Sequence, residues 1–329
     1  MILIGIFGTL GAAGTVPYVA LGPGPTYDTL GMVDGRAVIT IAGQDTYATG
    51  GQLNMTTVSV GTDLSLFAAL GKWLSGRYAL VPREEIFPPD RTEDEVQQEQ
   101  AQAFQDSEAY AETAALAYLK FPLTPIVNLV LADAPVQGQL QQGDELISVD
   151  GRAVTGAEQV REVLADTRPG QVIEIRYRRG PATSTATVTL GSRDDRTSGF
   201  LGVELANQAD VPFDITISLA DIGGPSAGLM FALAIVDKLT PGELNGGQFV
   251  AGTGEITSEG QVGPIGGIPF KMVAAREAGA TVFLVPAGNC VEARQRAPEG
   301  LRLVKVETLS SAVEALDALR AGREAPSCG

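Results

Sequence analysis

Gly223-Gly-Pro-Ser-Ala-Gly228 leads directly into the apolar run Leu229–Val236, and this stretch decides how the chain is interpreted. It predicts a helix from about Ser226 to Lys238, because serine satisfies an unpaired amide and proline suits the first helical turn. A well-capped helix is the ordinary interpretation of such a tetrapeptide. The paired glycines, however, let a ligand approach the backbone closely. Amides at a helix N-terminus can also hold a developing oxyanion.

A second glycine pair, Gly266-Gly267, precedes Ile268-Pro-Phe-Lys271 and the short run Met272–Ala275. Lys271 opens a predicted helix that ends near Gly279, and the helix dipole disfavours a cation at that end. A lysine in a first helical turn is ordinarily solvated. The apolar neighbours favour desolvation, which lowers a lysine pKa and yields a neutral amine that can act as a general base.

The composition of the 329-residue chain excludes several classes of site. It contains no histidine, so Ser-His-Asp and Cys-His arrangements and the usual zinc sites cannot form within it. A nucleophilic hydrolase would need another base, for which lysine is the obvious choice. The two cysteines lack CxxC spacing and cannot form a four-ligand metal site, and we expect no cofactor. The net charge of -16 argues against a nucleic-acid partner.

The N-terminus carries an apolar segment without a charged residue up to Asp28. Residues 1–22 are predicted to be a transmembrane or signal-anchor helix, since about 20 apolar residues span a bilayer. A buried strand or helix, or a signal peptide that is removed, are the alternatives. Gly5, Gly8, Gly11, Gly14 and Pro17 weaken the helix. We expect a single-pass protein of the cell membrane, with the rest of the chain outside the cytoplasm.

Residues 28–118 are predicted to form an α+β region. Strands are expected at 36–41 and 53–60, and an apolar helical spacing predicts a helix over 63–75. A long helix is expected from Thr92 to about Leu119, opened by a capping box with Glu95.

After the long helix, the sequence pattern of residues 119–198 predicts a domain of short strands and turns. We expect strands at 126–131, 171–177 and 185–190 and a helix at 158–165. With Gly143-Asp-Glu-Leu-Ile147 this order resembles a PDZ domain, a resemblance that also rests on Ala134-Pro135, Leu140, Val149-Asp-Gly151 and Val154. It implies a peptide ligand that adds as a strand, with its carboxylate held by backbone amides. A structural spacer is the alternative. Ser198–Val203 looks like the carboxylate loop but follows the predicted domain, and the start of a strand of the next domain is the other interpretation.

Residues 199–322 are predicted to form a further α+β domain, followed by a tail at 323–329. Several motifs in it resemble the proteolytic domain of Lon proteases, and more closely the bacterial membrane-anchored Lon-like proteases that carry a PDZ domain and no ATPase. The motifs are Gly223–Gly228, Gly252–Thr257, Gly260–Val262, Pro264–Gly267, Lys271, Ala274-Ala275 and Ala278-Gly279, and Val16–Leu21, Pro23–Thr26 and Leu229–Ile235 also match that group.

This resemblance implies roles for particular residues. Ser226 would be the nucleophile, Lys271 its base and Thr253 a support for the lysine. The oxyanion and substrate region would be formed by Gly223, Gly224, Pro225 and Ala227. Residues 34–75 resemble the first part of the same domain, so the PDZ domain would be an insertion within it.

The departure from full-length Lon is equally informative. No G-x-x-x-x-G-K-[ST] occurs, so no ATP motor is expected. We therefore expect an ATP-independent serine endopeptidase acting on unfolded or flexible polypeptides, with the PDZ domain presenting or gating them. A ring of identical chains is expected from the resemblance alone. The rival hypotheses are a non-enzymatic PDZ peptide-binding adaptor with a degenerate protease fold, and an enzyme held shut at rest.

Cys290 and Cys328 are both late in the chain. Free thiols are the simplest interpretation, but export to an oxidising compartment favours a disulfide. Such a bond would fix the C-terminal tail and contribute about 4 kcal/mol in the chain-entropy model.

Overall fold

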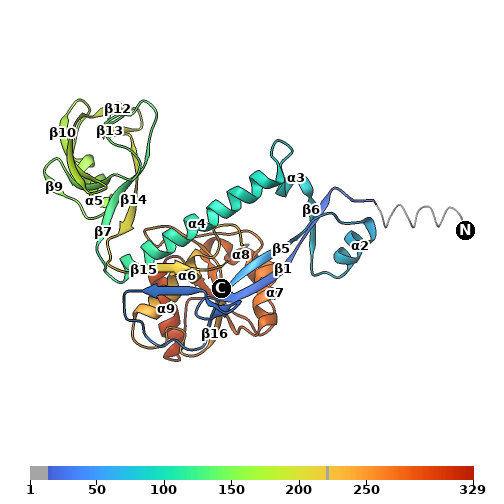
Figure 1. The fold of residues 1–329 in the computed structure, drawn as a ribbon. Helices are drawn as coiled ribbons and strands as arrows, with labels where there is room; N and C mark the ends of the chain where they lie inside the picture. The colour runs from blue at the N-terminus through green and yellow to red at the C-terminus, as the bar shows by residue number, and fades with distance from the viewer. Residues whose placement is uncertain (1–13, 220–221) are drawn as a thin grey trace, which may run out of the picture. The chain divides into compact units, whose positions relative to one another are not determined.

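The computed structural model describes residues 14–219 and 222–329, and the chain divides into two units. The first unit contains the chain up to Ala115 together with Phe213–Gly329, and the second unit is Leu116–Pro212. Figure 1 shows both units along the chain. The second unit is therefore an insertion between two parts of the first.

A six-stranded sheet in the order β20-β19-β16-β5-β1-β6 forms the centre of the first unit. Strands β5, β16, β19 and β20 are parallel, whereas β1 is antiparallel to both β5 and β6. The strands are β1 (Tyr18–Asp28), β5 (Gln52–Gly61), β6 (Ala79–Pro82), β16 (Phe249–Gly252), β19 (Val282–Pro286) and β20 (Arg302–Val306). Because β5 pairs with β16, the parts of the chain before and after the insertion share one sheet.

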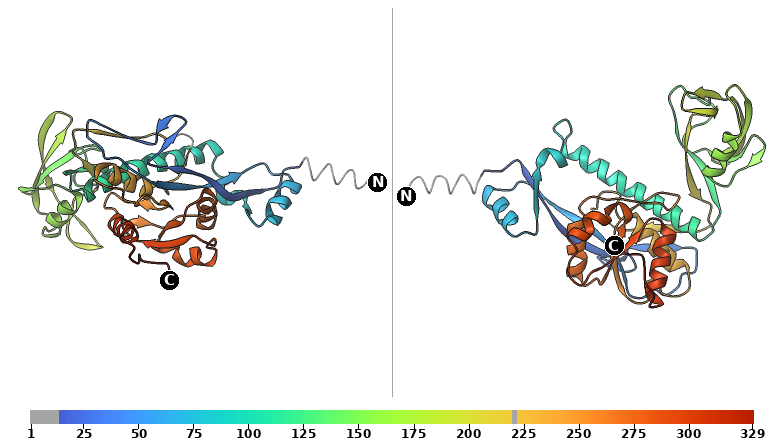
Figure 2. Two further views of the ribbon diagram at one scale, coloured as in Figure 1. Left: turned by 90° about the horizontal axis from the view of Figure 1, so that it is seen from below. Right: turned by 180° about the vertical axis from the view of Figure 1, so that it is seen from behind.

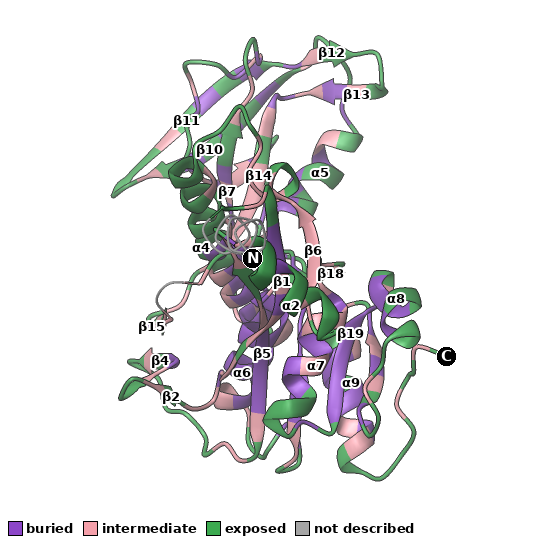
Figure 3. Cartoon of the chain, turned by 90° about the vertical axis from the view of Figure 1, so that its right-hand side faces the viewer, coloured by how far each residue is buried: buried purple, intermediate pink, exposed green. Residues whose placement is uncertain are grey.

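The helices of the first unit cover this sheet. Helix α6 packs on β5 and against α9, while α7 packs on β1 and β5 and against α8. Their bounds are α6 (Gly228–Leu239), α7 (Ile268–Ala278), α8 (Cys290–Gln295) and α9 (Leu309–Arg320). Residues Gly228–Asp237 of α6 are all buried, which Figure 3 shows as a purple helix. The unbroken apolar run of this helix explains its burial on every side.

Helix α4 (Glu93–Tyr118) begins in the first unit and carries the predicted capping box. Glu95 Oε2 accepts from the Thr92 amide at 2.8 Å, and the Glu95 amide donates to Thr92 Oγ1 at 3.2 Å, so this prediction is confirmed. The smaller elements of the unit are β2 (Met32–Val33), β3 (Arg36–Ala37), β4 (Ile39–Ala42), α2 (Leu66–Leu74), α3 (Arg83–Ile86), β15 (Asp214–Ile217), β17 (Glu255–Ile256) and β18 (Val262–Gly263).

A disulfide between Cys290 and Cys328 holds the C-terminal tail, with the two Cα atoms 5.1 Å apart. The tail is also held by the Lys305 amide, which donates to the Pro326 carbonyl at 3.0 Å. The tail therefore lies along β20.

The second unit is a sheet in the order β11-β10-β8-β7-β14, with β9 paired to β8. Its elements are β7 (Leu123–Val130), β8 (Glu145–Val149), β9 (Arg152–Ala153), α5 (Ala157–Ala165), β10 (Val172–Arg179), β11 (Ala182–Thr189), β12 (Gly191–Arg193), β13 (Arg196–Phe200) and β14 (Val203–Ala209). The buried Asp144 accepts two hydrogen bonds of 2.7 Å from Arg179. The predicted strands, short helix and hairpin are present in the expected order.

The predicted boundary of this domain at residue 198 is wrong. Strand β14 pairs with β7 over Val203–Ala209, and the unit ends at Pro212. The segment Ser198–Gly202, which contains the end of β13 and the turn to β14, therefore belongs to the inserted unit rather than to the C-terminal domain. The error arose because β14 finds its partner more than seventy residues back in the sequence, and local patterns carry no signal for such pairing.

Only the last part of the predicted N-terminal anchor, from residue 14 to residue 22, can be compared with the structure. Residues 1–13 lie outside the described part of the chain. Tyr18–Leu21 belong to β1 and pair with β6, so a helix continuing to residue 22 is wrong. Val19 and Ala20 are buried in the sheet, which explains the apolar character of this end of the segment. None of the helices in residues 14–219 and 222–329 is long and apolar enough to cross a membrane.

Candidate active site

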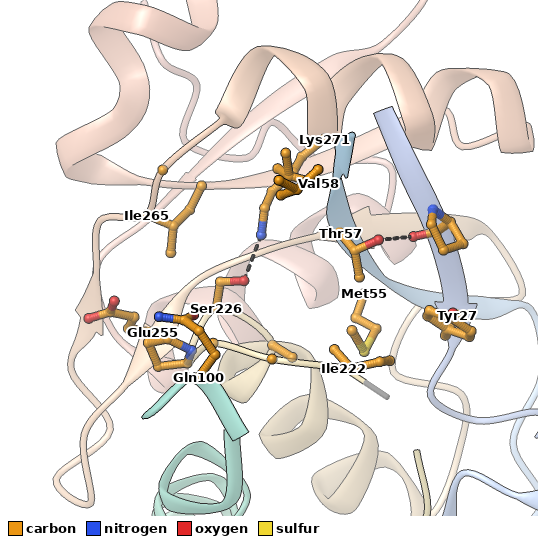
Figure 4. Close-up of a pocket in the computed structure, with 17 residues that line it drawn as sticks. Tyr27, Met55, Thr57, Val58, Gln100, Ile222, Ser226, Glu255, Ile265 and Lys271 are labelled. Carbon is orange, nitrogen blue, oxygen red and sulfur yellow. Dashed lines mark hydrogen bonds between the residues drawn. The ribbon is translucent and has the colours of Figure 1, made fainter. Parts of the chain in front are cut away.

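A cavity of about 430 Å³ lies in the first unit where the loop before α6 meets the sheet and α7. Its lining comes from β1 and β5, from α4, from the loop 222–227 and from the start of α7 (Figure 4). The lining residues are Pro25, Tyr27, Met55, Thr57, Val58, Val60, Gln100, Ile222, Gly223, Gly224, Pro225, Ser226, Ala227, Glu255, Ile265, Gly266 and Lys271. A predominantly apolar cavity with a few converging polar groups is typical of a binding or catalytic site.

Ser226 lies in this cavity on the loop before α6, not within the helix. Helix α6 begins at Gly228, its N-cap position is Ala227, and no side chain caps it. The expected capping role of the serine is therefore wrong. Its hydroxyl is instead directed at a side chain that comes from a distant part of the sequence (Figure 4).

Three predicted side chains meet at one point. Lys271 Nζ lies 2.6 Å from Ser226 Oγ and 2.9 Å from Thr253 Oγ1. Thr253 follows β16, and its hydroxyl donates to the Ser226 carbonyl at 3.0 Å. The serine and lysine are thus within the hydrogen-bond reach expected of a nucleophile and its base, and the threonine contacts both of them.

Lys271 is placed in this site by the first turn of α7. The helix starts after Gly267, whose φ of +72° is a left-handed conformation that favours glycine. Only 3% of Lys271 is exposed. Burial lowers its pKa from 10.5 to about 8, because the charged ammonium loses its hydration. An appreciable fraction of the amine is consequently neutral near neutral pH.

The backbone around Ser226 is held from both sides. The Gly224 amide donates to the Gln100 carbonyl at 2.8 Å, and Ser107 Oγ donates to the Pro225 carbonyl at 2.9 Å. On the other side, the Gly254 amide donates to the Ser226 carbonyl at 2.9 Å. The first two contacts come from α4, which also packs Phe104 edge-on against Phe231 of α6 at 5.7 Å between ring centroids.

Gln100 and Ser107 were not foreseen from the sequence. They lie in a Glu/Gln/Ala-rich helix whose pattern indicates only a solvated face. Ser107 is nevertheless buried. The spacing within α4 contains no sign that these residues contact a loop more than a hundred positions later.

The predicted oxyanion and substrate region lies at the cavity, but not every member has an amide that can hold an oxyanion. All four of its members, Gly223, Gly224, Pro225 and Ala227, line the cavity. The Gly224 amide is already engaged by Gln100, and proline has no amide hydrogen to offer. Because the described part of the chain has no cis peptide, the Pro225 carbonyl and the Ser226 N–H point in opposite directions. Ser107 therefore turns the Ser226 N–H away from α4.

Two family models match the chain. Residues 205–318 match the Lon protease (S16) C-terminal proteolytic domain, and residues 101–190 match the PDZ domain. The first match contains Ser226, Thr253 and Lys271.

Several curated proteins that are similar to this chain are named Lon protease. The chain is 33% identical over 165 residues to a Lon protease of Desulforamulus reducens, which covers 46% of this chain and 19% of that protein. It is 41% identical over 93 residues to a Lon protease of Heliobacterium modesticaldum, covering 27% and 11% respectively. The matched segments thus span less than a fifth of these curated relatives. Among solved structures, the PDZ domain of an SdrC-like protein of Listeria monocytogenes is similar at 24% identity, covering 25% of this chain and 85% of that one with a TM-score of 0.23.

Proposed function

We propose that this chain, which joins a proteolytic domain of the Lon type to a PDZ domain, is a serine endopeptidase that uses a Ser226-Lys271 dyad. One observation carries the proposal, the 2.6 Å separation of Lys271 Nζ and Ser226 Oγ within a cavity. Without histidine, the chain has lysine as the group able to accept the serine proton near neutral pH. Thr253 orients the amine through its 2.9 Å contact.

The proposed reaction has two halves. The neutral amine of Lys271 takes the proton of Ser226 as Oγ attacks the scissile carbonyl, and the resulting ammonium then gives that proton to the departing amine. An ester between Ser226 and the acyl part of the substrate remains. A water molecule then attacks this ester, Lys271 accepts its proton, and the proton returns to Ser226 Oγ when the acid product leaves.

The same geometry supports a donor for the oxyanion. With the Pro225 carbonyl held by Ser107, the Ser226 N–H points to the opposite side of its peptide plane, away from α4. An amide donor next to the nucleophile can hydrogen-bond the negative oxygen of the tetrahedral intermediate. We therefore assign the Ser226 N–H this role in place of the Gly224 amide. Ser107 is a positioning residue in this scheme, because it acts through the peptide and not on the substrate.

We further propose that this chain needs no nucleotide. The sequence lacks a phosphate-binding G-x-x-x-x-G-K-[ST] loop, so no energy source for unfolding a substrate is present in it. Flexible or unfolded polypeptides are then the substrates, since they can enter a cavity of about 430 Å³ as an extended chain. The ring of identical chains expected from the resemblance stays a prediction.

A loosely folded substrate tests this function. The purified chain is expected to cleave casein without ATP, and ATP with magnesium should leave the initial rate unchanged. A compact protein of similar size, such as intact green fluorescent protein, should stay uncut under the same conditions. Casein cleavage that appears only when ATP is added would refute nucleotide independence, and cleavage of the compact protein would refute the substrate class.

We propose that the inserted domain binds the C-terminus of the substrate or of a regulatory peptide. Strand β14 is an edge of the sheet, and α5 packs against it. An extended peptide can pair with such an edge, and a glycine-containing loop can hold its carboxylate. The turn Leu201-Gly202 between β13 and β14 directly precedes β14, and Gly202 has a φ of +86°. These features support a groove between β14 and α5.

Peptides with a free and an amidated C-terminus distinguish this mode of binding from others. A casein-derived peptide with a free carboxylate is expected to bind at least about tenfold more tightly than its amide, because charge-assisted contacts to backbone amides are lost. Fluorescence anisotropy of labelled peptides measures both affinities. Equal affinities would show that the inserted domain does not recognise chain ends, and would leave the spacer interpretation in place.

A further inference from the structure

Helix α2 turns its apolar side chains to the solvent. Five residues, defined here as the α2 face, are between 44% and 75% exposed: Leu66, Phe67, Leu70, Trp73 and Leu74. They follow the spacing of one side of a helix. In contrast, Ala69 is the residue of α2 that is buried. Figure 3 shows α2 in green, whereas α6 of the same unit is purple.

The α2 face continues into a groove of about 290 Å³. Val16 and Tyr18, at the start of the described chain and of β1, line it together with Leu80 of β6 and with residues of α2. Tyr18 is itself exposed. Contiguous exposed apolar surface of this kind marks an interaction site in a soluble protein.

The charge of this region differs from that of the rest of the chain. Residues 1–27 contain no charged side chain, and residues 64–82 contain Lys72 and Arg77 but no acid. These two segments lie side by side, because the Val16 amide donates to the Leu64 carbonyl at 2.9 Å and β1 pairs with β6. The whole chain carries 39 acidic residues. The two segments are therefore poor in acids for this chain, although Arg77 forms an ion pair with Glu277 of α7.

The position of α2 also favours a planar partner. Figures 1 and 2 show α2 at the end of the β1 and β5 strands, away from α6 and α9 of the same unit. The thirteen residues before Gly14 are joined to the chain at this place, and they too are apolar and uncharged. An apolar end that carries tryptophan, tyrosine and lysine matches the composition of surfaces that lie in the interface of a bilayer.

We propose that the α2 face inserts into the surface of a lipid bilayer. The helix would lie in the plane of the interface, with Phe67, Trp73 and Leu74 among the acyl chains to a depth of roughly 5–10 Å. Lys72 would face the headgroups. The contact holds the first unit at the membrane independently of how residues 1–13 are arranged.

Trp73 is the sole tryptophan of the chain and therefore reports on α2 alone. The full chain is mixed with vesicles of phosphatidylcholine and phosphatidylglycerol, with and without brominated acyl chains. The proposal expects a blue shift of the emission on binding and strong quenching by the brominated lipid. Co-sedimentation with vesicles but no quenching would overturn it, because the chain would then be attached through another segment.

A matched pair of variants separates insertion of the α2 face from attachment through a different apolar surface. Phe67→Ser combined with Leu74→Ser is expected to weaken vesicle binding roughly tenfold or more, since two large apolar side chains no longer leave water. Val291→Ser, at an equally exposed position on α8, should leave binding unchanged. Binding that the double substitution leaves unchanged would overturn the proposal.

The emission of Trp73 without lipid tests whether protein already covers the face. A blue shift of this emission that increases with protein concentration would show that a second copy of the chain covers the α2 face. A blue shift that is independent of protein concentration and unaffected by vesicles would show that another part of the same chain covers the α2 face. Either result would overturn the proposal.

Discussion

The Ser226→Ala variant is expected to cleave casein at least about a thousandfold more slowly than the unchanged chain, because the proposed acyl-enzyme cannot form without a nucleophile. Ser226 Oγ is the atom that lies 2.6 Å from Lys271 Nζ, so the substitution removes one half of the dyad. The initial rate of release of labelled casein fragments measures the effect. Covalent labelling by a fluorophosphonate probe should disappear in parallel.

The variant should keep its fold. The Lys271 amine retains its 2.9 Å contact with Thr253, so the loss of one hydrogen bond should change the free energy of unfolding by about 1 kcal/mol. Ser310→Ala, at an exposed position on α9, is the matched control and should have full activity. Equal cleavage by the Ser226→Ala variant would exclude Ser226 as the nucleophile. A chain that binds peptides but never cleaves casein would support the adaptor hypothesis.

The members of the candidate site could be predicted because their short motifs resemble those of Lon proteases; local patterns alone indicated a capped helix and a solvated lysine. Gly223–Gly228 and Gly266–Lys271 each place a polar side chain at the start of an apolar helix, and the missing histidines left lysine as the base. The structure brings Ser226, Lys271 and Thr253 together within 3 Å of one another. The elements that carry them were also predicted, since α6 and α7 have strong apolar patterns.

What could not be predicted depends on contacts between distant parts of the chain. Strand β14 was assigned to the wrong domain because its partner, β7, lies far back in the sequence. Ser107 and Gln100 escaped notice because the pattern of a polar helix gives no sign of which distant residues it touches. Gly224 was assigned to the oxyanion and substrate region, and only the position of α4 shows that its amide is engaged. The hydrophobic periodicity of a sequence predicts a single helix or strand. These errors concern contacts between two elements, which that periodicity does not describe.

Replacing Lys271 by methionine is expected to reduce casein cleavage by at least about a thousandfold while preserving the shape of the buried side chain. In the unchanged chain the reaction needs the neutral amine, whose pKa is lowered by burial to about 8. The kcat/KM for a peptide substrate should therefore fall about tenfold for each pH unit below 8 and level off above it. The variant should lose this dependence together with its activity. Lys305→Met, which alters a partly exposed lysine paired with Glu307 away from the cavity, should change neither.

The Lys271→Met variant should lose activity but gain stability at neutral pH. This combination distinguishes a catalytic lysine from one that supports the fold. The folded chain holds the Lys271 proton less tightly than the unfolded chain, where the pKa is near 10.5. Burying the cation therefore costs up to roughly 3 kcal/mol at pH 7, and the cost disappears as the pH rises from 8 to 10.5. The Lys271→Met variant should unfold at higher denaturant concentration at pH 7 and lack the gain in stability over that window. A variant that is both active and less stable would mean that Lys271 supports the fold and that another group is the base.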